Sequence, residues 1–419
     1  MNRISLEKIS KIINSGLTPL RSNKEYWIDG NIPWVKTEQL GDKYIYDSNE
    51  KITNYALQNT SIKLNSPNTL SIAMYGEGKT RGSVSILKNE TTTNQACCNI
   101  FIDEEKADFE FVYYNIKTQY NNLRNLSSGV RKNLNSRDIK NFEILLPNLQ
   151  IQKSIAKVLS DLDSKIAINN KINAALEAMA KTLYDYWFVQ FDFPDKNGKP
   201  YKSSEGKMIF NEELKREIPV GWESGTFETF STIIGGSTPS KSITENFTKE
   251  VNMSWITPKD LSLNKGKKFI TRGEWDVTNF GIKSASLKIM PKGTVLLSSR
   301  APIGYLAISR KEVTTNQGFK SFVPKENYSS EFIYYSVKNQ IPKIEAYSSG
   351  STFKEVSLSV LKTIKISIPN KNILEKYYKI SKPIFKEQNL LELENQKLSE
   401  LRDWLLPMLM NGQVRVGEK

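Results

Sequence analysis

The tetrapeptide Thr92-Thr93-Asn94-Gln95 recurs as Thr314-Thr315-Asn316-Gln317, 222 positions further along the chain. Other segments recur at an offset of 221 or 222: Trp34-Val35 with Trp255-Ile256, Tyr113-Tyr114 with Tyr334-Tyr335, Ser127-Ser128-Gly129 with Ser348-Ser349-Gly350, and Pro147 with Pro369. Chance matches would not keep one offset across separate segments. Because the interval is far longer than a solenoid unit of about 20–50 residues, we interpret the chain as one duplicated module. Two such modules can present two similar surfaces to one extended, repetitive partner.

Length and composition are those of an ordinary globular protein. The 419 residues suffice for two to three domains of about 100–200 residues each. A content of 38% hydrophobic and 25% charged residues permits a sizeable core. No apolar run approaches the ~18 residues of a membrane span, and the N-terminal stretch lacks a signal-peptide core. We therefore expect a cytoplasmic protein without membrane contact.

The balance of charged residues favours an acidic partner. There are 59 Lys and Arg against 45 Asp and Glu, a net charge of +14, and nucleic acid is the commonest partner of such a chain. An AT-rich genome, which enriches Lys and Asn everywhere, would give the same balance. Histidine is absent, which excludes His-based nucleases and Ser-His or Cys-His nucleophile pairs. The two cysteines, Cys97 and Cys98, cannot supply a four-ligand zinc site, so we expect neither catalytic residues nor a metal.

Each copy divides into a globular part and a long helix. The globular parts, 1–147 and 224–369, contain short strands separated by turn signals, predicted at 69–75, 84–87, 294–298 and 306–309, with closing strands before Pro147 and Pro369. Short helices are predicted at 108–123 and 329–340. Each globular part should thus be a compact α+β or mostly β domain.

The segments 148–190 and 370–412 follow a heptad pattern that predicts two long helices forming an antiparallel coiled coil. Polar residues interrupt the pattern at Lys165, Asn169, Glu387 and Glu394, as in helix pairs whose register is fixed by polar contacts. Independent helices, each packing on its own domain, are the alternative. The predicted seam consists of Ile155, Val158, Leu162, Ile172, Leu176, Met179, Leu183, Ile380, Ile384, Leu391, Leu398, Leu401 and Leu405.

The complete prediction is an α+β chain with a pseudo-two-fold internal repeat, in which two similar domains are separated by the helix pair. Residues 191–223 form a polar connecting linker that is rich in turn signals, and we expect it to fold as a small hairpin on the helices. Residues 413–419 form a C-terminal tail.

Two apparent catalytic motifs are weak. Residues 73–80 fit a loose phosphate-loop pattern, but residues 81–87 do not read as the required helix, so a basic hairpin loop is the better interpretation. Asp195, Glu205 and Lys207 resemble an acidic nuclease triad, yet they lie in a turn-rich linker. No Pro-Pro dipeptide and no Gly-rich loop for S-adenosylmethionine occurs, which argues against methyl transfer by this chain.

Loops at matching places in the two copies carry residues suited to nucleic acid. Lys and Arg neutralise phosphates, Arg, Asn and Gln pair with base edges, and glycine lets the backbone approach closely. The Asn-Gln pairs may equally cap turns. The candidate DNA-binding residues are Lys36, Tyr75, Lys79, Arg81, Gly82, Asn94, Gln95, Ser128, Gly129, Arg131 and Lys132 in the first copy, and Thr257, Lys259, Ser299, Arg300, Asn316, Gln317, Ser349, Gly350, Thr352 and Lys354 in the second.

Taken together, these features resemble the specificity subunit of a type I restriction–modification system, over nearly the whole chain. The most specific stretches are Pro147-Asn148-Leu149-Gln150-Ile151-Gln152, which is similar to the family's helix opening, and Leu405-Leu406-Pro407-Met408, which is similar to its second helix terminus. The Trp34 and Trp255 segments resemble recurring marks of its target recognition domains. The second helix opening, Asn370-Lys371-Asn372-Ile373, departs from the motif.

The resemblance implies that each recognition domain reads one half of a bipartite, asymmetric target in double-stranded DNA. The helices would set the spacing and form a platform for two methyltransferase subunits, joined in a full system by restriction and translocase subunits. S-adenosylmethionine, ATP and Mg²⁺ would act in those partners, with no cofactor in this chain. A solitary modification enzyme, a stand-alone two-lobed DNA-binding regulator and a nuclease that uses Asp195 remain alternatives.

Overall fold

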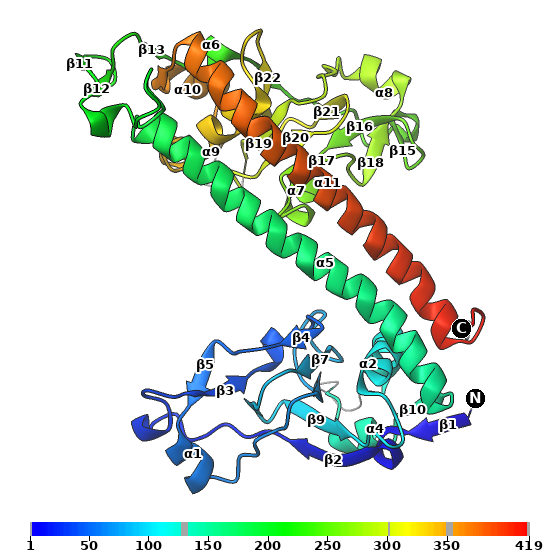
Figure 1. Cartoon of the computed structure of the whole chain (residues 1–419). Helices are drawn as coiled ribbons and strands as arrows, with labels where there is room; N and C mark the ends of the chain where they lie inside the picture. Colours follow the sequence, from blue (N-terminus) through cyan, green and yellow to red (C-terminus); the bar gives the residue numbers. More distant parts are fainter. Residues whose placement is uncertain (1, 127–132, 301, 349–354, 417–419) are drawn as a thin grey trace. The chain divides into compact units, whose positions relative to one another are not determined.

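Two long helices, α5 (Leu149–Tyr184) and α11 (Lys371–Met410), are the largest elements of the computed structural model (Figure 1). The structure describes residues 2–126, 133–300, 302–348 and 355–416. The chain divides into two compact units, Met1–Ala167 with Lys397–Lys419, and Ile168–Gln396. Each unit therefore contains one globular domain and a part of both helices.

The first domain is built on one larger and one smaller sheet. Its five-stranded sheet has the order β2 (Ser10–Ser15), β9 (Cys97–Ile102), β6 (Thr69–Ala73), β7 (Val84–Leu87) and β4 (Tyr44–Ile45). The smaller sheet has the order β5 (Glu50–Ile52), β3 (Ile32–Val35) and β8 (Thr92–Thr93). β1 (Asn2–Ser5) pairs with β10 (Glu143–Leu146), the strand predicted before Pro147.

The second domain repeats this plan, with one additional strand in its smaller sheet. Its five-stranded sheet has the order β14 (Ser231–Gly235), β22 (Phe319–Pro324), β19 (Val295–Ser298), β20 (Leu306–Ser309) and β17 (Phe269–Ile270). The smaller sheet has the order β15 (Phe247–Thr248), β18 (Trp275–Val277), β16 (Met253–Ile256) and β21 (Val313–Thr315). β13 (Glu223–Gly225) pairs with β23 (Ile366–Ile368). The internal repeat predicted from the sequence is confirmed.

The recurring sequence segments lie next to one another in space. Trp34 of β3 is opposite Thr92 of β8 in a parallel pair, and Trp255 of β16 is opposite Thr314 of β21 in the same arrangement. Each indole Nε1 donates to a backbone carbonyl near the start of its domain, that of Leu17 at 2.9 Å or Ser237 at 3.2 Å. The repeated Trp and Thr-Thr segments therefore form one structural motif, used twice.

The predicted short helices begin at capping residues. The Asp108 carboxylate accepts from the backbone N–H of Phe111 and starts α2 (Phe109–Thr118), which α3 (Tyr120–Asn125) follows. The Ser329 hydroxyl accepts from Phe332 and starts α9 (Ser330–Ala346). Such side-chain acceptors satisfy backbone donors that the first turn of a helix leaves unpaired. Each helix buries its Tyr-Tyr pair, with ring centroids 5.2 Å apart in both copies.

The remaining helices are short and close turns around the sheets. In the first domain they are α1 (Asn54–Asn59) and α4 (Ser136–Lys140). In the second they are α6 (Phe227–Phe230), α7 (Pro258–Leu263), α8 (Asn279–Ser284) and α10 (Leu358–Thr363).

The long helices run antiparallel. Within the first unit, Arg402 Nη1 of α11 donates to Asp163 Oδ1 of α5 at 2.8 Å. Within the second unit, Asn169 Nδ2 donates to Glu394 Oε2 at 2.7 Å and Asn395 Oδ1 at 2.9 Å. Residue numbers rise along one helix as those of its partners fall along the other, which confirms the predicted antiparallel pairing.

The packed face of these helices differs in part from the predicted heptad seam. Ile155 and Leu391 are buried, whereas Ile172, Met179, Ile380 and Leu401 are 42–58% exposed and lie outside the packed face. Beyond Asn169, one of the predicted polar positions, the buried residues of the α5 segment include Ala180, Tyr184 and Trp187, which follow a spacing of four and three. A straight helix of 3.6 residues per turn drifts away from a strict 3.5-residue repeat, so the four exposed positions rotate out of contact.

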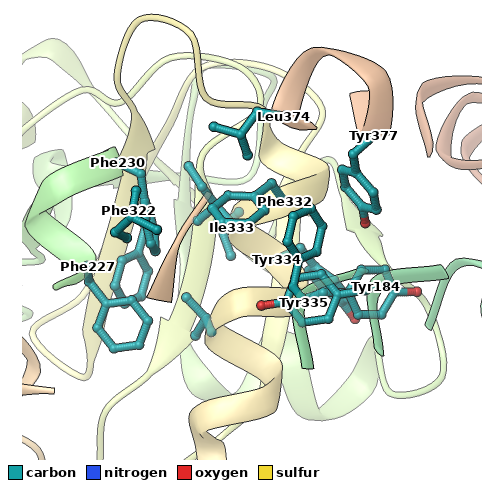
Figure 2. Packing of buried hydrophobic residues seen from close by; sticks show 14 of the residues in the cluster. Tyr184, Phe227, Phe230, Phe322, Phe332, Ile333, Tyr334, Tyr335, Leu374 and Tyr377 are labelled. Carbon is teal, nitrogen blue, oxygen red and sulfur yellow. The ribbon is translucent and has the colours of Figure 1, made fainter. Parts of the chain in front are cut away.

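An aromatic cluster joins α5, α9 and α11 in the second unit. Tyr184 lies against Tyr335 and Phe332, and Tyr377 lies 4.9 Å from Phe188 between ring centroids (Figure 2). The connecting segment belongs to this cluster, because Phe193 stacks on Trp222 at 5.3 Å and both rings are buried. Within it β11 (Met208–Asn211) pairs with β12 (Arg216–Pro219). The prediction of a hairpin packed on the helices is confirmed.

A buried lysine connects each domain with the long helices of its unit. Lys268, whose side chain is 3% exposed, lies 2.6 Å from Glu177 Oε2 of α5 and donates to Gln388 Oε1 of α11 at 2.6 Å. It also donates to the Tyr335 hydroxyl and lies 3.7 Å from the centroid of the Phe385 ring. Burial lowers the pKa of Lys268 to about 8.

The first unit has a related arrangement, in which the lysine lies beside α5. Lys43 donates to the Tyr114 hydroxyl at 2.8 Å and lies 3.3 Å from Glu110 and 3.8 Å from Asp163 of α5. The Tyr114 hydroxyl donates to Asp163, just as the Tyr335 hydroxyl donates to Glu177. The second tyrosine of each repeated pair is therefore part of the connection between domain and helix.

Replacing Lys268 by Met should lower the free energy of unfolding by about 1–3 kcal/mol, because it removes one of the two cations paired with Glu177 and leaves the buried Gln388 oxygen without its donor. Urea unfolding of the full chain measures this change. Lys362→Met is the matched control, since Lys362 forms an exposed pair with Glu228 and should cost less than about 1 kcal/mol. Equal losses in the two variants would contradict the structural role given to Lys268.

Glu177 should make stability depend on acid pH. Burial opposes its ionisation, but the charges of Lys268 and Lys338 and their hydrogen bonds lower the pKa of Glu177 to about 2. A carboxyl whose pKa is depressed by folding stabilises the fold above its unfolded value near 4.5, and this contribution is lost as the pH falls toward 2. Unfolding measured between pH 5 and 3 should show a shallower pH slope for Glu177→Gln than for the unmodified chain. Parallel slopes would exclude this assignment.

Candidate nucleic-acid interface

The hairpin between β6 and β7 places Tyr75, Lys79, Arg81 and Gly82 at one edge of the first domain. β6 and β7 are antiparallel neighbours, and the loop between them leads into a strand and not into a helix. This arrangement confirms the interpretation as a basic hairpin and contradicts the interpretation as a phosphate loop. Tyr75 is 41% exposed. Gly82 has a φ of +85°, and a Cβ there would lie 3.3 Å from the Tyr120 ring, so this turn requires glycine.

The equivalent turn of the second domain corrects one prediction. Ser299 is fully buried, and its backbone N–H donates to the Gly318 carbonyl at 2.8 Å. Its hydroxyl is thus unavailable to DNA, because the chain continues from β19 inside the fold at this point. Arg300 is at the surface, with Nε 3.0 Å from Glu355 Oε2. A phosphate or base would have to compete with that carboxylate.

The Asn-Gln pairs follow β8 and β21, beside the tryptophan strands. Asn94 Oδ1 accepts from the Cys97 thiol at 3.2 Å, and Asn316 Oδ1 accepts from the backbone N–H of Gly318 at 2.9 Å. Thr18 and Thr238 donate to the carboxamide oxygens of Gln95 and Gln317. The side-chain oxygens of the two Asn-Gln pairs thus accept hydrogen bonds within the domain, which supports the turn-capping interpretation. Contact of their side-chain amide nitrogens with bases stays a prediction.

In the first domain, an arginine that the sequence analysis missed fills the space beside Trp34. The Arg21 guanidinium lies 3.8 Å from the ring centroid of Trp27 and 4.7 Å from that of Trp34, and it pairs with Glu50. Glu50 also lies 2.8 Å from Lys36. The hydrogen bond from Arg21, followed by that from Lys36, lowers the pKa of Glu50. The planar cation, two aromatic rings and the carboxylate form one closed cluster.

The corresponding part of the second domain is open. A cavity of about 920 Å³ is bordered by Thr257, Lys259, Asn316 and Gln317 among the predicted residues. The aromatic residues Phe247, Trp255 and Trp275 also line it. Lys259 Nζ lies 2.6 Å from Glu274 Oε2, and the hydrogen bond with Glu274 raises the pKa of Lys259.

Trp255 was indicated by its place in the repeat, whereas Phe247, Trp275 and Arg21 were not predicted from the sequence. The signal was present in part, because Arg21 and Lys241 follow the repeated Thr-Pro pair in each copy. The eight predicted residues Ser128, Gly129, Arg131, Lys132, Ser349, Gly350, Thr352 and Lys354 lie outside the residues that the structure describes. Their contact with DNA stays a prediction.

The nuclease alternative finds no support in the linker geometry. Asp195 Oδ1 accepts from the backbone N–H groups of Asn197 and Lys199, so this carboxylate closes a turn. Within the described ranges, no group of three or more His, Cys, Asp and Glu side chains is placed to hold a metal ion. A search of the same residues found no helix long and apolar enough to cross a membrane.

Comparison with known proteins identifies the class. The family model for the type I restriction modification DNA specificity domain matches residues 1–178 and again 219–402. The chain therefore belongs to this family, and its domains are two copies of the family's domain. The fold class and the restriction–modification specificity function indicated by the sequence are confirmed.

Individual relatives agree with this assignment. The chain is similar to the type I restriction enzyme MjaIX specificity subunit of Methanocaldococcus jannaschii, with 38% identity over 48% of this chain and 46% of that protein. It is 26% identical to the HindI specificity subunit of Haemophilus influenzae, over 68% of this chain and 72% of the relative. A crystal structure of an S subunit from M. genitalium has the same fold, with a TM-score of 0.65, 17% identity, and coverage of 100% of this chain and 96% of that one. These relatives do not support a stand-alone regulator.

Replacing Glu274 by Gln should strengthen DNA binding, because it removes a negative charge and releases Lys259. One additional phosphate contact would steepen the slope of log K against log salt by about 0.9. Fluorescence anisotropy with duplex DNA at several salt concentrations measures the slope. The control Glu228→Gln releases Lys362, which does not line the cavity, and should leave the slope unchanged. An unaltered slope for Glu274→Gln would exclude Lys259 from phosphate contact.

Proposed function

We propose that the chain reads a bipartite, asymmetric target in double-stranded DNA, with one half-site for each domain. The observation that carries this proposal is that the same framework is built twice with different side chains at equivalent places. The register pairs Trp34 with Glu50 in β5 and Trp255 with Trp275 in β18. Lys36 and Thr257 follow these tryptophan strands at the same distance. Two surfaces of one plan but different chemistry suit two different half-sites.

The long helices supply a surface for partner subunits. In the second unit Ile172, Met179 and Ile380 lie outside the packed face, and in the first unit Leu401 and the 57% exposed Trp404 of α11 are exposed. Exposed apolar side chains along regular helices are typical of protein-binding surfaces. We propose that two methyltransferase subunits bind these helices, and that restriction subunits join them in a full system.

In this proposal, methylation at adenine N6 belongs to the methyltransferase subunits with S-adenosylmethionine. Cleavage with ATP and Mg²⁺ would belong to the restriction subunits. This chain would supply the sequence-dependent contacts and the scaffold.

The proposal is tested by co-expressing the chain with the methyltransferase encoded beside it and sequencing the methylated bases of host DNA. One bipartite motif with a fixed spacer should appear only when both proteins are present. Exchanging residues 1–147 for those of a relative should change one half of that motif and leave the other half and the spacer unaltered. The reciprocal exchange of 224–369 is the matched control and should change the other half. Absence of new methylation, or alteration of both halves by one exchange, would contradict the proposal.

A further inference from the structure

The cavity of the second domain has an aromatic wall and a polar rim. Phe247 and Trp255 lie 5.1 Å apart between ring centroids, and Trp275 follows them along the same wall. Trp255 is 5% exposed and belongs to the core, whereas Trp275 is 39% exposed and offers ring surface to the cavity. The Lys249 ammonium lies 4.8 Å from the Trp275 ring centroid, and the part of the ring that stays exposed can stack with a flat group at the edge of the cavity.

The first domain shows what kind of group this framework accepts. There the guanidinium of Arg21, a flat and delocalised group, lies over Trp27, also contacts the nearly perpendicular ring of Trp34, and pairs with Glu50. In the second domain Lys241 follows the Thr-Pro pair in place of Arg21, and Trp275 stands at the strand position of Glu50. Both Arg21 and Glu50 are thus replaced in the second domain. The corresponding space there is open to a flat group of a ligand.

The charges around the cavity favour a neutral flat group over a cation. Asp260 accepts at Oδ2 from the Thr257 backbone N–H and hydroxyl and at Oδ1 from the Glu274 backbone N–H. Glu274 is paired with Lys259. Of the two carboxylates that line the cavity, Glu274 is therefore already paired with a cation, and both oxygens of Asp260 accept hydrogen bonds within the domain.

The polar rim suits a nucleotide. Lys241 lines the cavity and forms no ion pair with any residue that the structure describes, so it can meet a phosphate. Lys249, which contacts the Trp275 ring, lies outside the lining of the cavity. The Asn316 side chain uses only its oxygen within the fold, which leaves the amide N–H groups for the edge of a base. Asn is a common partner of base edges.

We propose that this cavity binds one unstacked base of the target DNA, which stacks on Trp275 with its backbone phosphate beside Lys241. The proposal rests on the proposed function and adds to it that the second half-site is read partly by insertion of a base, whereas the first is not, because Arg21 already occupies the equivalent space. Stacking on an aromatic ring accepts any base, and hydrogen bonds to Asn316 would give it preference.

Trp275→Ala in the full chain tests the proposal, with Phe280→Ala as the matched control. Phe280 is 55% exposed in the same domain but does not line the cavity. Binding is measured by anisotropy with the duplex target identified by methylome sequencing, and with duplexes that carry a single abasic site at each position in turn. Trp275→Ala should weaken binding of the intact target about tenfold, and Phe280→Ala should not. Trp275→Phe should retain most of the affinity.

The abasic series separates stacking from general damage to the domain. At one position of the second half-site, the abasic duplex should bind the unmodified chain and Trp275→Ala equally, because the base that contacts Trp275 is missing. An equal loss at every position, or no loss with the intact target, would overturn the proposal. Weakened assembly with methyltransferase at unchanged DNA affinity would assign the cavity to a protein side chain and also overturn it. An unmodified chain that shows no preference for the target would instead contradict the proposed function itself.

Discussion

The contact between a buried lysine and a carboxylate of α5 is the constraint on which each unit depends. Lys268 reaches Glu177 and Gln388 on both long helices, and Lys43 reaches Asp163. A buried cation is tolerated only with close, well-oriented partners, so each lysine accepts one placement of its domain on the helices of its unit. Hydrophobic packing alone, such as that around Tyr377, would permit small rotations that a charged pair at 2.6 Å does not. In the proposed function, precise placement matters because base contacts require a fixed register.

Comparison of the two copies distinguishes the residues that the fold requires from the residues that can change. Trp34 and Trp255, the buried threonines beside them and the Tyr-Tyr pairs serve the fold in both copies, which explains why they recur in the sequence. Side chains around the tryptophans differ: Arg21 and Glu50 close the first site, whereas Trp275 leaves the second open. A scaffold of this kind can change its target at one site without disturbing the lysine contact that holds the domain.

Local signals made much of the fold predictable. The strands 84–87 and 306–309 have the predicted bounds, since short apolar runs between turn residues rarely adopt another structure. The antiparallel helix pair also follows from its pattern, but Ile172 and Met179 are exposed because the strict heptad ignores the drift of a straight helix. The candidate site was predictable only in part. Ser299 is buried because of strand pairing, and the stacking of Arg21 depends on how β3 and β5 align. Both are long-range consequences of folding that no local pattern contains.

Carboxylates beside the basic residues determine how much of the net charge is available to DNA. Lys36 is paired with Glu38 and Glu50, Lys259 with Glu274, and Arg300 with Glu355. Every such pair weakens the sequence-independent attraction to phosphates, on which non-specific binding depends. The loss of affinity that these ion pairs cause is smaller at a cognate site. Base contacts and stacking there add binding free energy that does not depend on the same charges. A recognition protein that must search long DNA therefore gains discrimination from acidic neighbours at its contact surface, even though each of them reduces its total affinity.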